Sequence, residues 1–92
     1  MDWQVYIILC TDDSLYTGIT NDIQRRFRQH DDGRGAKYFR GRRPLRIVYL
    51  ESGHDRRSAS RREAAIKKLT RFGKLQLIAR CRAAAHPRGG VM

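Results

Sequence analysis

Two short segments near the start of the chain, both rich in β-branched and aromatic residues, constrain its fold most strongly. Residues 3–10 (WQVYIILC) and 15–20 (LYTGIT) contain no proline and only one glycine between them. Such segments are typical of strands that pack against a core. The turn-forming sequence Thr11-Asp12-Asp13 lies between them, so we predict a β-hairpin.

The length of the hairpin loop decides where two tyrosines point. A two-residue loop at residues 12–13 would place Tyr6 and Tyr16 on opposite faces of the sheet, because strand side chains alternate. A three-residue loop at residues 11–13 would pair Tyr6 with Gly18 and bring both tyrosines to one face, within reach of each other. The sequence leaves both loops open. A glycine opposite Tyr6 would leave room above the strand, which a purely structural pair would not need.

Helical spacing follows the hairpin. Ile23, Phe27 and His30 recur at intervals that place them on one face of a helix, which we expect over residues 22–30. Asn21 is the expected N-cap of this helix.

Three further elements are expected after a basic loop at residues 31–44. They are a strand at residues 45–50, a helix that begins at Ser58 or Ser60 and reaches about Leu69, and a helix capped by Thr70. The third helix is expected to turn four residues towards the core: Phe72, Leu75, Ile78 and Cys81.

The predicted order β-β-α-β-α-α describes an α+β domain, in which helices cover a small three-stranded sheet. The 92 residues suffice for one domain, which we assign to residues 1–82. Residues 83–92 (AAAHPRGGVM) carry no patterned apolar face, and we expect them to form a flexible tail.

The chain is strongly basic, with 20 lysines and arginines against 9 acidic residues and a net charge of +11. Such an excess on a small surface favours a polyphosphate partner, which means DNA or RNA. An acidic membrane surface is the main competitor, but no predicted helix carries bulky aromatic residues along one face. A bland alternative is an arginine-rich composition with no specific role.

The sequence also bears on the compartment. No apolar run approaches the roughly 20 residues that a membrane helix needs. The N-terminus carries Asp2 and lacks the basic start and small-residue cleavage site of a signal peptide. We therefore expect a cytoplasmic protein with no membrane partner. Cys10 and Cys81 show no metal-binding spacing, so we expect them to be reduced thiols.

Three polar side chains outside the hairpin are candidates for chemistry. Arg26 and His30 are four residues apart on one helix face, at the boundary with the core. Glu63 lies in the middle of the second predicted helix. Each also has a structural interpretation: Arg26 as a boundary side chain, Glu63 as a capping-box partner of Ser60 or an ion-pair partner of Lys67.

Taken together, these residues resemble a known family. Val5-Tyr6-Ile7 and Tyr16-Thr17-Gly18 match the two halves of the GIY-YIG nuclease signature. The continuation to His30 (YTGITNDIQRRFRQH), the basic segment GAKYFRGRRP and the later SRREAAIKKL look like the small stand-alone bacterial members. The resemblance covers about residues 3–80.

The resemblance implies a three-stranded antiparallel sheet flanked by helices, and hydrolysis of a nucleic-acid phosphodiester with one divalent metal, Mg²⁺ or Mn²⁺. By position, Tyr6 and Tyr16 are the paired tyrosines, one of which activates water. Arg26 would stabilise charge on the phosphate, His30 matches a histidine near the site, and Glu63 would hold the metal. One carboxylate suffices for Mg²⁺, which fills its remaining positions with water and substrate phosphate.

The sequence departs from the family pattern at three places. Val5 stands in place of the first glycine, and Ile19 stands where some members carry a lysine. No asparagine follows Asn21, so Lys74 or Gln76 would take the place of the family's late asparagine.

The predicted nucleic-acid contacts are mostly in the basic loop, where Tyr38 and Phe39 are also expected to be available for stacking. The set comprises Arg25, Arg34, Lys37, Tyr38, Arg40, Arg42, Arg43 and Lys67.

Two functions follow. The first is a metal-dependent nuclease for DNA, with branched and single-stranded DNA among its candidate substrates and RNA left open. Without a groove-filling element it would read structure rather than sequence. The second is a basic nucleic-acid-binding module that kept the fold and lost efficient chemistry. A ribosome-associated protein would fit the charge but explain none of the site residues.

Overall fold

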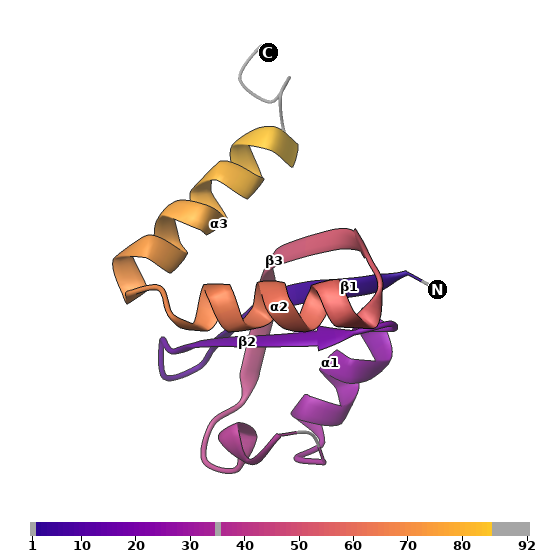
Figure 1. Ribbon diagram of the computed structural model, residues 1–92. Helices are drawn as coiled ribbons and strands as arrows, with labels where there is room; N and C mark the ends of the chain where they lie inside the picture. Colours follow the sequence, from indigo (N-terminus) through magenta and orange to yellow (C-terminus); the bar gives the residue numbers. More distant parts are fainter. Residues whose placement is uncertain (1, 35, 86–92) are drawn as a thin grey trace.

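A computed structural model describes residues 2–34 and 36–85 of the protein. A three-stranded sheet lies at its centre, with helices on both sides (Figure 1). The elements in chain order are β1 (Trp3–Cys10), β2 (Leu15–Thr20), α1 (Ile23–Asp31), the 3₁₀ helix η1 (Lys37–Phe39), β3 (Pro44–His54), α2 (Arg56–Lys67) and α3 (Arg71–Ala85). The predicted α+β class and order are confirmed, with η1 as an addition.

The sheet is antiparallel, in the order β2-β1-β3. The central strand β1 is the most buried, because it has a partner on both edges and helices on both faces. β3 begins one residue earlier and ends four residues later than the sequence predicts. Its pairing with β1 contains register shifts, so the ladder is irregular along this edge.

The hairpin uses a three-residue loop. The backbone N–H of Cys10 donates to the carbonyl of Ser14 at 2.9 Å, which leaves residues 11–13 as the loop. Asp13, the last of them, has a φ of 70°, as expected for the left-handed residue that closes such a loop. Of the two loops that the sequence leaves open, the one that brings the tyrosines together is therefore present.

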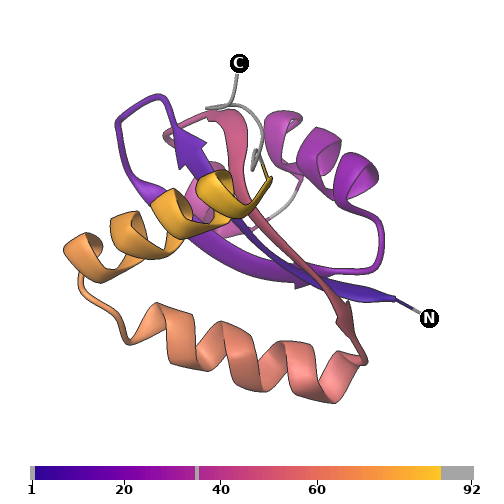
Figure 2. The ribbon, with the colours of Figure 1, turned by 90° about the horizontal axis from the view of Figure 1, so that it is seen from above.

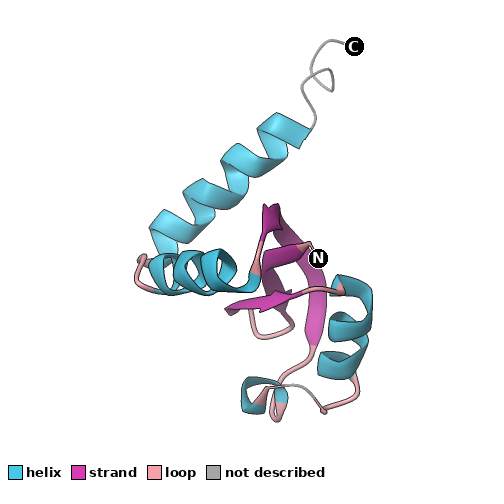
Figure 3. Ribbon diagram, turned by 45° about the vertical axis from the view of Figure 1, so that its right-hand side comes forward, coloured by secondary structure: helices cyan, strands magenta, loops and turns pink. Residues whose placement is uncertain are grey.

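The two faces of the sheet carry separate apolar clusters. α2 and α3 lie on one side of the strands and α1 lies on the other (Figure 3). The cluster under α2 and α3 is built on Val5, Ile7, Tyr49, Ala59, Ile66 and Ile78. The cluster on the α1 side is built on Tyr6, Ile8, Cys10 and Phe39. Alternation along β1 thus supplies both clusters from one strand.

For two helices the N-cap is a different residue from the one predicted. α1 is capped by Asp22, whose carboxylate accepts a hydrogen bond from the Arg25 backbone N–H, rather than by Asn21. α2 is capped by Asp55, which accepts from the Ser58 backbone N–H at 2.8 Å. In both cases an aspartate adjacent to the helix takes the role, because a short carboxylate is an equally good acceptor there.

The orientation of α3 also differs from the prediction. Phe72 is 68% exposed and Leu75 is 43% exposed, whereas Ile78 is buried and Cys81 is half-buried. In the view from above, α3 passes over the sheet at an angle (Figure 2). Its later turns pack on the core and its first turns do not. Thr70 does cap this helix, accepting from the Gly73 backbone N–H.

Three remaining predictions concern the C-terminal tail, the two cysteines and the absence of a membrane helix. α3 continues to Ala85 and so includes the first three residues of the predicted tail; residues 86–92 lie outside the described part. The division into a domain and a flexible tail stays a prediction. Cys10 and Cys81 are free thiols. None of the helices described is both long and apolar enough to span a bilayer.

Gly18 is the position where the sheet tolerates no side chain. A Cβ at Gly18 would lie 2.5 Å from Tyr6 Oη and 2.7 Å from Tyr6 Cζ. Tyr6 is fully buried, so its ring cannot swing aside into solvent. We predict that Gly18→Ala lowers the free energy of unfolding by about 1–3 kcal/mol, the usual cost of overpacking.

Urea unfolding of Gly18→Ala beside Gly41→Ala provides the measurement. A Cβ at Gly41 would have no neighbouring atom within 4 Å, so its substitution should be close to neutral. Equal stability of the two variants would show that Tyr6 does not require the gap above Gly18.

Candidate active site

Tyr6 and Tyr16 lie on the same face of the hairpin. The register pairs Tyr6 with Gly18 and Ile8 with Tyr16, so the tyrosines occupy diagonal positions on neighbouring strands. Their ring centroids are 6.2 Å apart. Tyr6 is fully buried and Tyr16 is half-buried. The missing side chain at Gly18 provides the space in which the Tyr6 ring lies.

His30 reaches the same place from the end of α1. Its Nε2 lies 2.9 Å from the Tyr6 hydroxyl, and its ring is packed 4.2 Å from the ring of Phe39. The side chain is buried, and burial together with the charge of Arg26 lowers the pKa of His30 to about 4. The imidazole is therefore neutral at pH 7. Its Nδ1 has no hydrogen-bond partner among the described residues.

Both tyrosine hydroxyls stay protonated at neutral pH. Burial, with a contribution from Tyr16, raises the pKa of Tyr6 to about 12, although Arg26 acts in the opposite direction. Burial also raises the pKa of Tyr16, against the opposing charges of Lys67 and Arg26. Desolvation outweighs the nearby cations at both positions. The residues alone therefore do not produce a phenolate.

Arg26 lies beside this pair, on the inner side of α1. The side chain is half-buried, and its Nη1 donates to Gln29 Oε1 at 3.1 Å, which restricts its position. Its positive charge opposes the rise in the pKa of Tyr6 and Tyr16 and contributes to the lowered pKa of His30. A guanidinium held next to two hydroxyls is suited to binding a phosphate.

Glu63 lies on α2, which packs against β2, the strand that carries Tyr16. Its negative charge acts to raise the pKa of both Tyr6 and Tyr16. Its Oε2 lies 3.4 Å from Lys67 Nζ, so the ion pair foreseen from the sequence is present. The alternative role of Glu63, as a capping-box partner of Ser60, is absent because Asp55 caps the helix. The five predicted catalytic residues thus come from four elements: β1, β2 and α1 meet at Tyr6, Tyr16 and His30, and α2 packs against β1 and β2.

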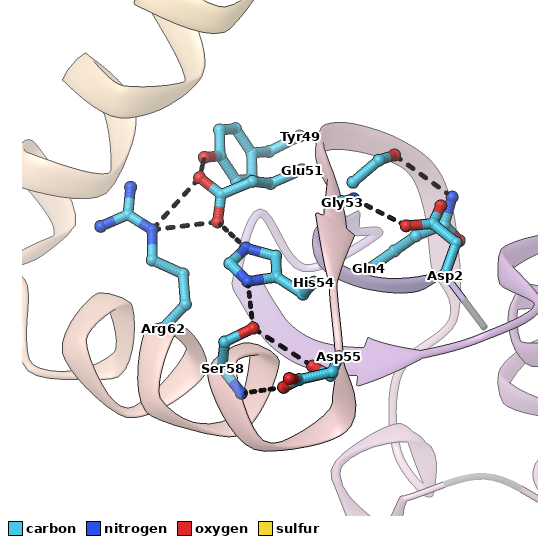
Figure 4. Close-up of polar contacts among 10 residues, drawn as sticks. Asp2, Gln4, Tyr49, Glu51, Gly53, His54, Asp55, Ser58 and Arg62 are labelled. Carbon is cyan, nitrogen blue, oxygen red and sulfur yellow. Dashed lines mark hydrogen bonds and ion pairs between the residues drawn. The ribbon is translucent and has the colours of Figure 1, made fainter.

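A second polar cluster, which the sequence did not reveal, joins α2 to the end of β3 (Figure 4). Glu51 accepts hydrogen bonds from Tyr49 Oη at 2.8 Å and from Arg62 Nε at 3.1 Å, and its Oε1 lies 2.9 Å from His54 Nε2. His54 Nδ1 in turn lies 2.8 Å from Ser58 Oγ. Burial raises the pKa of Glu51, but these partners outweigh burial and the net shift is downward.

This cluster fixes the α2 backbone next to Glu63. Arg62 and Glu63 are neighbours in the chain, so the carboxylate of Glu51 indirectly sets where Glu63 lies. One sequence signal could have indicated the cluster. Tyr49 and Glu51 are two residues apart in a strand and therefore share a face.

The seven lysines and arginines among the predicted nucleic-acid contacts fall into two groups. Arg25, Lys37 and Arg40 are exposed, and no ion pair engages them in the described part of the chain. The others have partners within the molecule: Arg34 with Asp32, Arg42 with Asp12, Arg43 with Asp31, and Lys67 with Glu63. The contacts of Arg42 and Arg43 tie the basic loop to the hairpin loop and to the end of α1. The roles of all eight predicted residues, Tyr38 included, stay predictions.

Of the two aromatic residues in the loop, only one is accessible. Tyr38 is half-buried and lies under the guanidinium of Arg42, 4.0 Å from the ring centroid. Phe39 is buried at 4% exposure, packed against Tyr16 and His30. The expectation that Phe39 is available for stacking is therefore wrong, because its ring completes the cluster behind the tyrosines.

The metal prediction rests on one carboxylate. The described residues contain no group of three or more His, Cys, Asp or Glu side chains that could enclose an ion. Glu63 is half-buried, and its charge acts on both tyrosines. A single carboxylate with room for water and a substrate phosphate fits the way Mg²⁺ is commonly held. Lys74 and Gln76, the substitutes for the late asparagine, lie on α3.

The fold and this cluster of tyrosines, arginine, histidine and glutamate define a nuclease-type domain. Residues 2–76 match the family described as the GIY-YIG catalytic domain, and the chain belongs to that family. It is 55% identical over 74 residues to the UPF0213 protein CPE1444 of Clostridium perfringens, covering 80% of each chain. It is 52% identical over 73 residues to the UPF0213 protein HQ_3675A of Haloquadratum walsbyi, covering 79% of this chain and 82% of that protein.

Two solution structures are similar to this fold. The UPF0213 protein BH0048 from Bacillus halodurans is 44% identical, with a TM-score of 0.55. The protein EF2693 from E. faecalis is 38% identical, with a TM-score of 0.60. Each comparison covers 86% of this chain and 84% of the other. The predicted family is thus confirmed, and the three-stranded fold agrees with its relatives.

The lowered pKa of His30 makes stability depend on pH. Between pH 6.5 and about 4 the unfolded chain binds a proton at this residue that the folded protein does not bind. We predict that this contribution is fully present above pH 6.5 and is lost as the pH falls towards 4. The total loss is roughly 3 kcal/mol.

Urea unfolding of the wild type and of His30→Gln at several pH values between 5 and 7 tests this. Carboxylates remain mostly ionised in that window, so the histidine dominates the slope. The variant should lose most of the slope. An identical slope in both proteins would contradict the assignment.

Proposed function

We propose that this protein is a metal-dependent endonuclease that hydrolyses phosphodiester bonds in DNA and selects its substrate by structure rather than sequence. The observation that carries the proposal is the cluster of Tyr6, Tyr16 and His30, with Arg26 on the same helix as His30 and Glu63 on the helix that packs beside β2. The positive net charge and the membership in the GIY-YIG catalytic domain family support a nucleic-acid substrate.

The two tyrosines have different roles in this proposal. Tyr6 is fully buried and its hydroxyl is engaged by His30. Tyr6 therefore has a supporting role, in which its hydroxyl holds the neutral imidazole of His30 in place. Tyr16 is half-buried, so its hydroxyl is the one that meets the attacking water. As a neutral phenol it aligns that water by a hydrogen bond.

Arg26 binds the scissile phosphate. Negative charge on the phosphate oxygens increases as water attacks, and a preorganised guanidinium stabilises it. The contact with Gln29 keeps the guanidinium from turning into solvent. Arg26 therefore supplies the main electrostatic stabilisation that the side chains of this chain can give.

Glu63 is the residue that would hold the divalent ion, Mg²⁺ or Mn²⁺. Such an ion would polarise a phosphate oxygen and increase the acidity of nearby water. That acidity matters here because burial raises the pKa of both tyrosines. Lys67 would exchange its contact with Glu63 for a contact with the substrate backbone.

A second candidate function is a nucleic-acid-binding module without efficient catalysis. The ion pair between Glu63 and Lys67 favours it, because this pair gives Glu63 a structural role that needs no metal. The raised pKa values of Tyr6 and Tyr16 favour it as well. Binding would then persist while cleavage is absent.

Three substitutions separate these candidates. Glu63→Gln, Arg26→Ala and Tyr16→Phe should each lower the cleavage rate by about 10²–10³, the usual cost of losing one preorganised contact. Melting temperatures should change little, because none of the three removes much buried apolar surface. The matched control is Arg28→Ala, an exposed arginine on the same helix as Arg26.

The measurement is the cleavage rate on labelled duplex, single-stranded and branched DNA and on RNA, with Mg²⁺, Mn²⁺ or EDTA. Cleavage that survives all three substitutions, or persists in EDTA, would assign the activity to a contaminant and favour the binding module. Activity losses that follow the losses in melting temperature would indicate structural roles instead.

The exposed cations of the basic loop should control the salt dependence of binding. Each phosphate neutralised on duplex DNA contributes about −0.9 to the log–log slope of affinity against salt. If Lys37 and Arg40 each contact one phosphate, then Lys37→Ala and Arg40→Ala should each flatten the slope by about that amount. Arg80→Ala, at an exposed position on α3, is the control. Slopes that stay unchanged would remove the loop from the interface.

A further inference from the structure

A cavity of about 260 Å³ lies beside the candidate active site, between the start of α1, the start of α2 and the adjoining ends of β1 and β2. Six of its lining side chains carry the argument: Trp3, Asn21, Arg25, Arg26, Gln29 and Arg56. Trp3 and Arg56 belong to none of the sets that the sequence or the proposed function assigns. The cavity is therefore an additional feature of the molecule.

The charge of the cavity is entirely positive. Three arginines line it and no carboxylate does. Arg26 is held by Gln29, whereas the exposed Arg25 and Arg56 take part in no ion pair within the described part of the chain. Like charges placed this close repel each other unless an anion neutralises them. Their fork-shaped donors are well suited to phosphate oxygens.

An aromatic ring forms another part of the lining. Trp3 is half-buried, and the guanidinium of Arg56 lies 5.4 Å from its ring centroid. Tryptophan rings and arginine planes are the surfaces on which proteins stack unpaired bases. The Asn21 side chain adds both a donor and an acceptor for a base edge. The arginines suit the phosphate of a nucleotide, and the Trp3 ring suits its base.

The size of the cavity limits what it can hold. Pockets for drug-sized ligands have volumes of roughly 300–1,000 Å³, so a cavity of about 260 Å³ has room for one nucleotide unit and little more. A base pair would not fit. A base that enters must be free of its complementary partner.

Arg26 connects the cavity to the catalytic cluster. It lines the cavity and also acts on Tyr6 and Tyr16. A strand with its scissile phosphate at Arg26 would therefore place an adjacent nucleotide at the mouth of the cavity. The cavity and the catalytic cluster thus share Arg26, and a bound nucleic-acid strand would pass from one to the other.

We propose that this cavity is a subsite for one unpaired nucleotide of the substrate strand, with its phosphate between Arg25 and Arg56 and its base against Trp3. The inference rests on the proposed function and specifies its substrate as single-stranded or locally unpaired nucleic acid. Stacking accepts every base, so the subsite distinguishes unpaired from paired strands without reading the sequence.

The fluorescence of Trp3 reports on the subsite directly, because it is the only tryptophan in the chain. The protein is titrated in EDTA, where cleavage does not interfere, with three ligands. These are a short oligothymidylate, the same strand annealed to its complement, and a strand of the same length with an abasic position at its centre. The RNA counterpart, an oligouridylate, distinguishes the two sugar chemistries.

The single strand should change the Trp3 emission and bind more tightly than the duplex. Arg56→Gln should weaken single-strand binding about tenfold, within the range for losing one charged or stacking contact. The matched control is Arg57→Gln, a neighbouring exposed arginine of α2 that does not line the cavity. It should bind like the wild type. Arg56 is exposed, so its loss should not unfold the domain.

Unchanged Trp3 emission on binding, or equal affinities of Arg56→Gln and Arg57→Gln, would overturn the subsite. The same holds if the duplex binds as tightly as the single strand. Failure of the proposed function is distinguishable. A protein that shows the fluorescence change and the Arg56 effect but never cleaves with Mg²⁺ keeps the subsite and loses the nuclease assignment.

Discussion

The close approach of Tyr6 to Gly18 is the contact on which the rest of the site depends. The phenol ring lies over a strand position that has no side chain, and its hydroxyl meets the imidazole of His30 in the interior. That hydrogen bond joins the central strand to the end of α1. It thereby ties the helix that carries Arg26 to the sheet. Tyr16, placed by the hairpin register, packs against the same rings.

The position of Glu63 depends on a separate cluster of hydrogen bonds around Glu51. Glu51, at the end of β3, collects hydrogen bonds from Tyr49 and Arg62 and contacts His54. These contacts hold α2 across the sheet and so set the location of Glu63. A catalytic constellation needs such supporting contacts, because a displaced side chain loses its electrostatic advantage. Glu51 thus has a supporting role rather than a chemical one.

Burial and nearby arginines together set the electrostatics of the site. Burial raises the pKa of both tyrosines and lowers the pKa of His30, so these groups are neutral at pH 7. The surrounding surface is cationic, through Arg25, Arg26 and Arg56 among others. The buried tyrosines and histidine therefore add no charge of their own, while the cationic surface beside them attracts a phosphate chain. Glu63, paired with Lys67, is the negative group of the proposed site. This arrangement is consistent with a substrate that brings its own charge into the site.

The sequence by itself determined the order of the three strands and three helices and the basic character of the surface, because these follow from local periodicity and charge. The tyrosines, arginine, histidine and glutamate were singled out as a site by the resemblance to the GIY-YIG signature, since periodicity alone gives each of them a structural interpretation. Only the tertiary structure decided the rest, since it depends on contacts between residues far apart in the chain. Hydrogen bonds selected the three-residue loop that brings the tyrosines together. Packing buried Phe39, which the sequence placed in an accessible loop, and left Phe72 exposed, which the helical spacing placed towards the core. The cavity that joins Trp3 to Arg56 arises only where the ends of four elements meet, and local patterns carry no information about such a meeting.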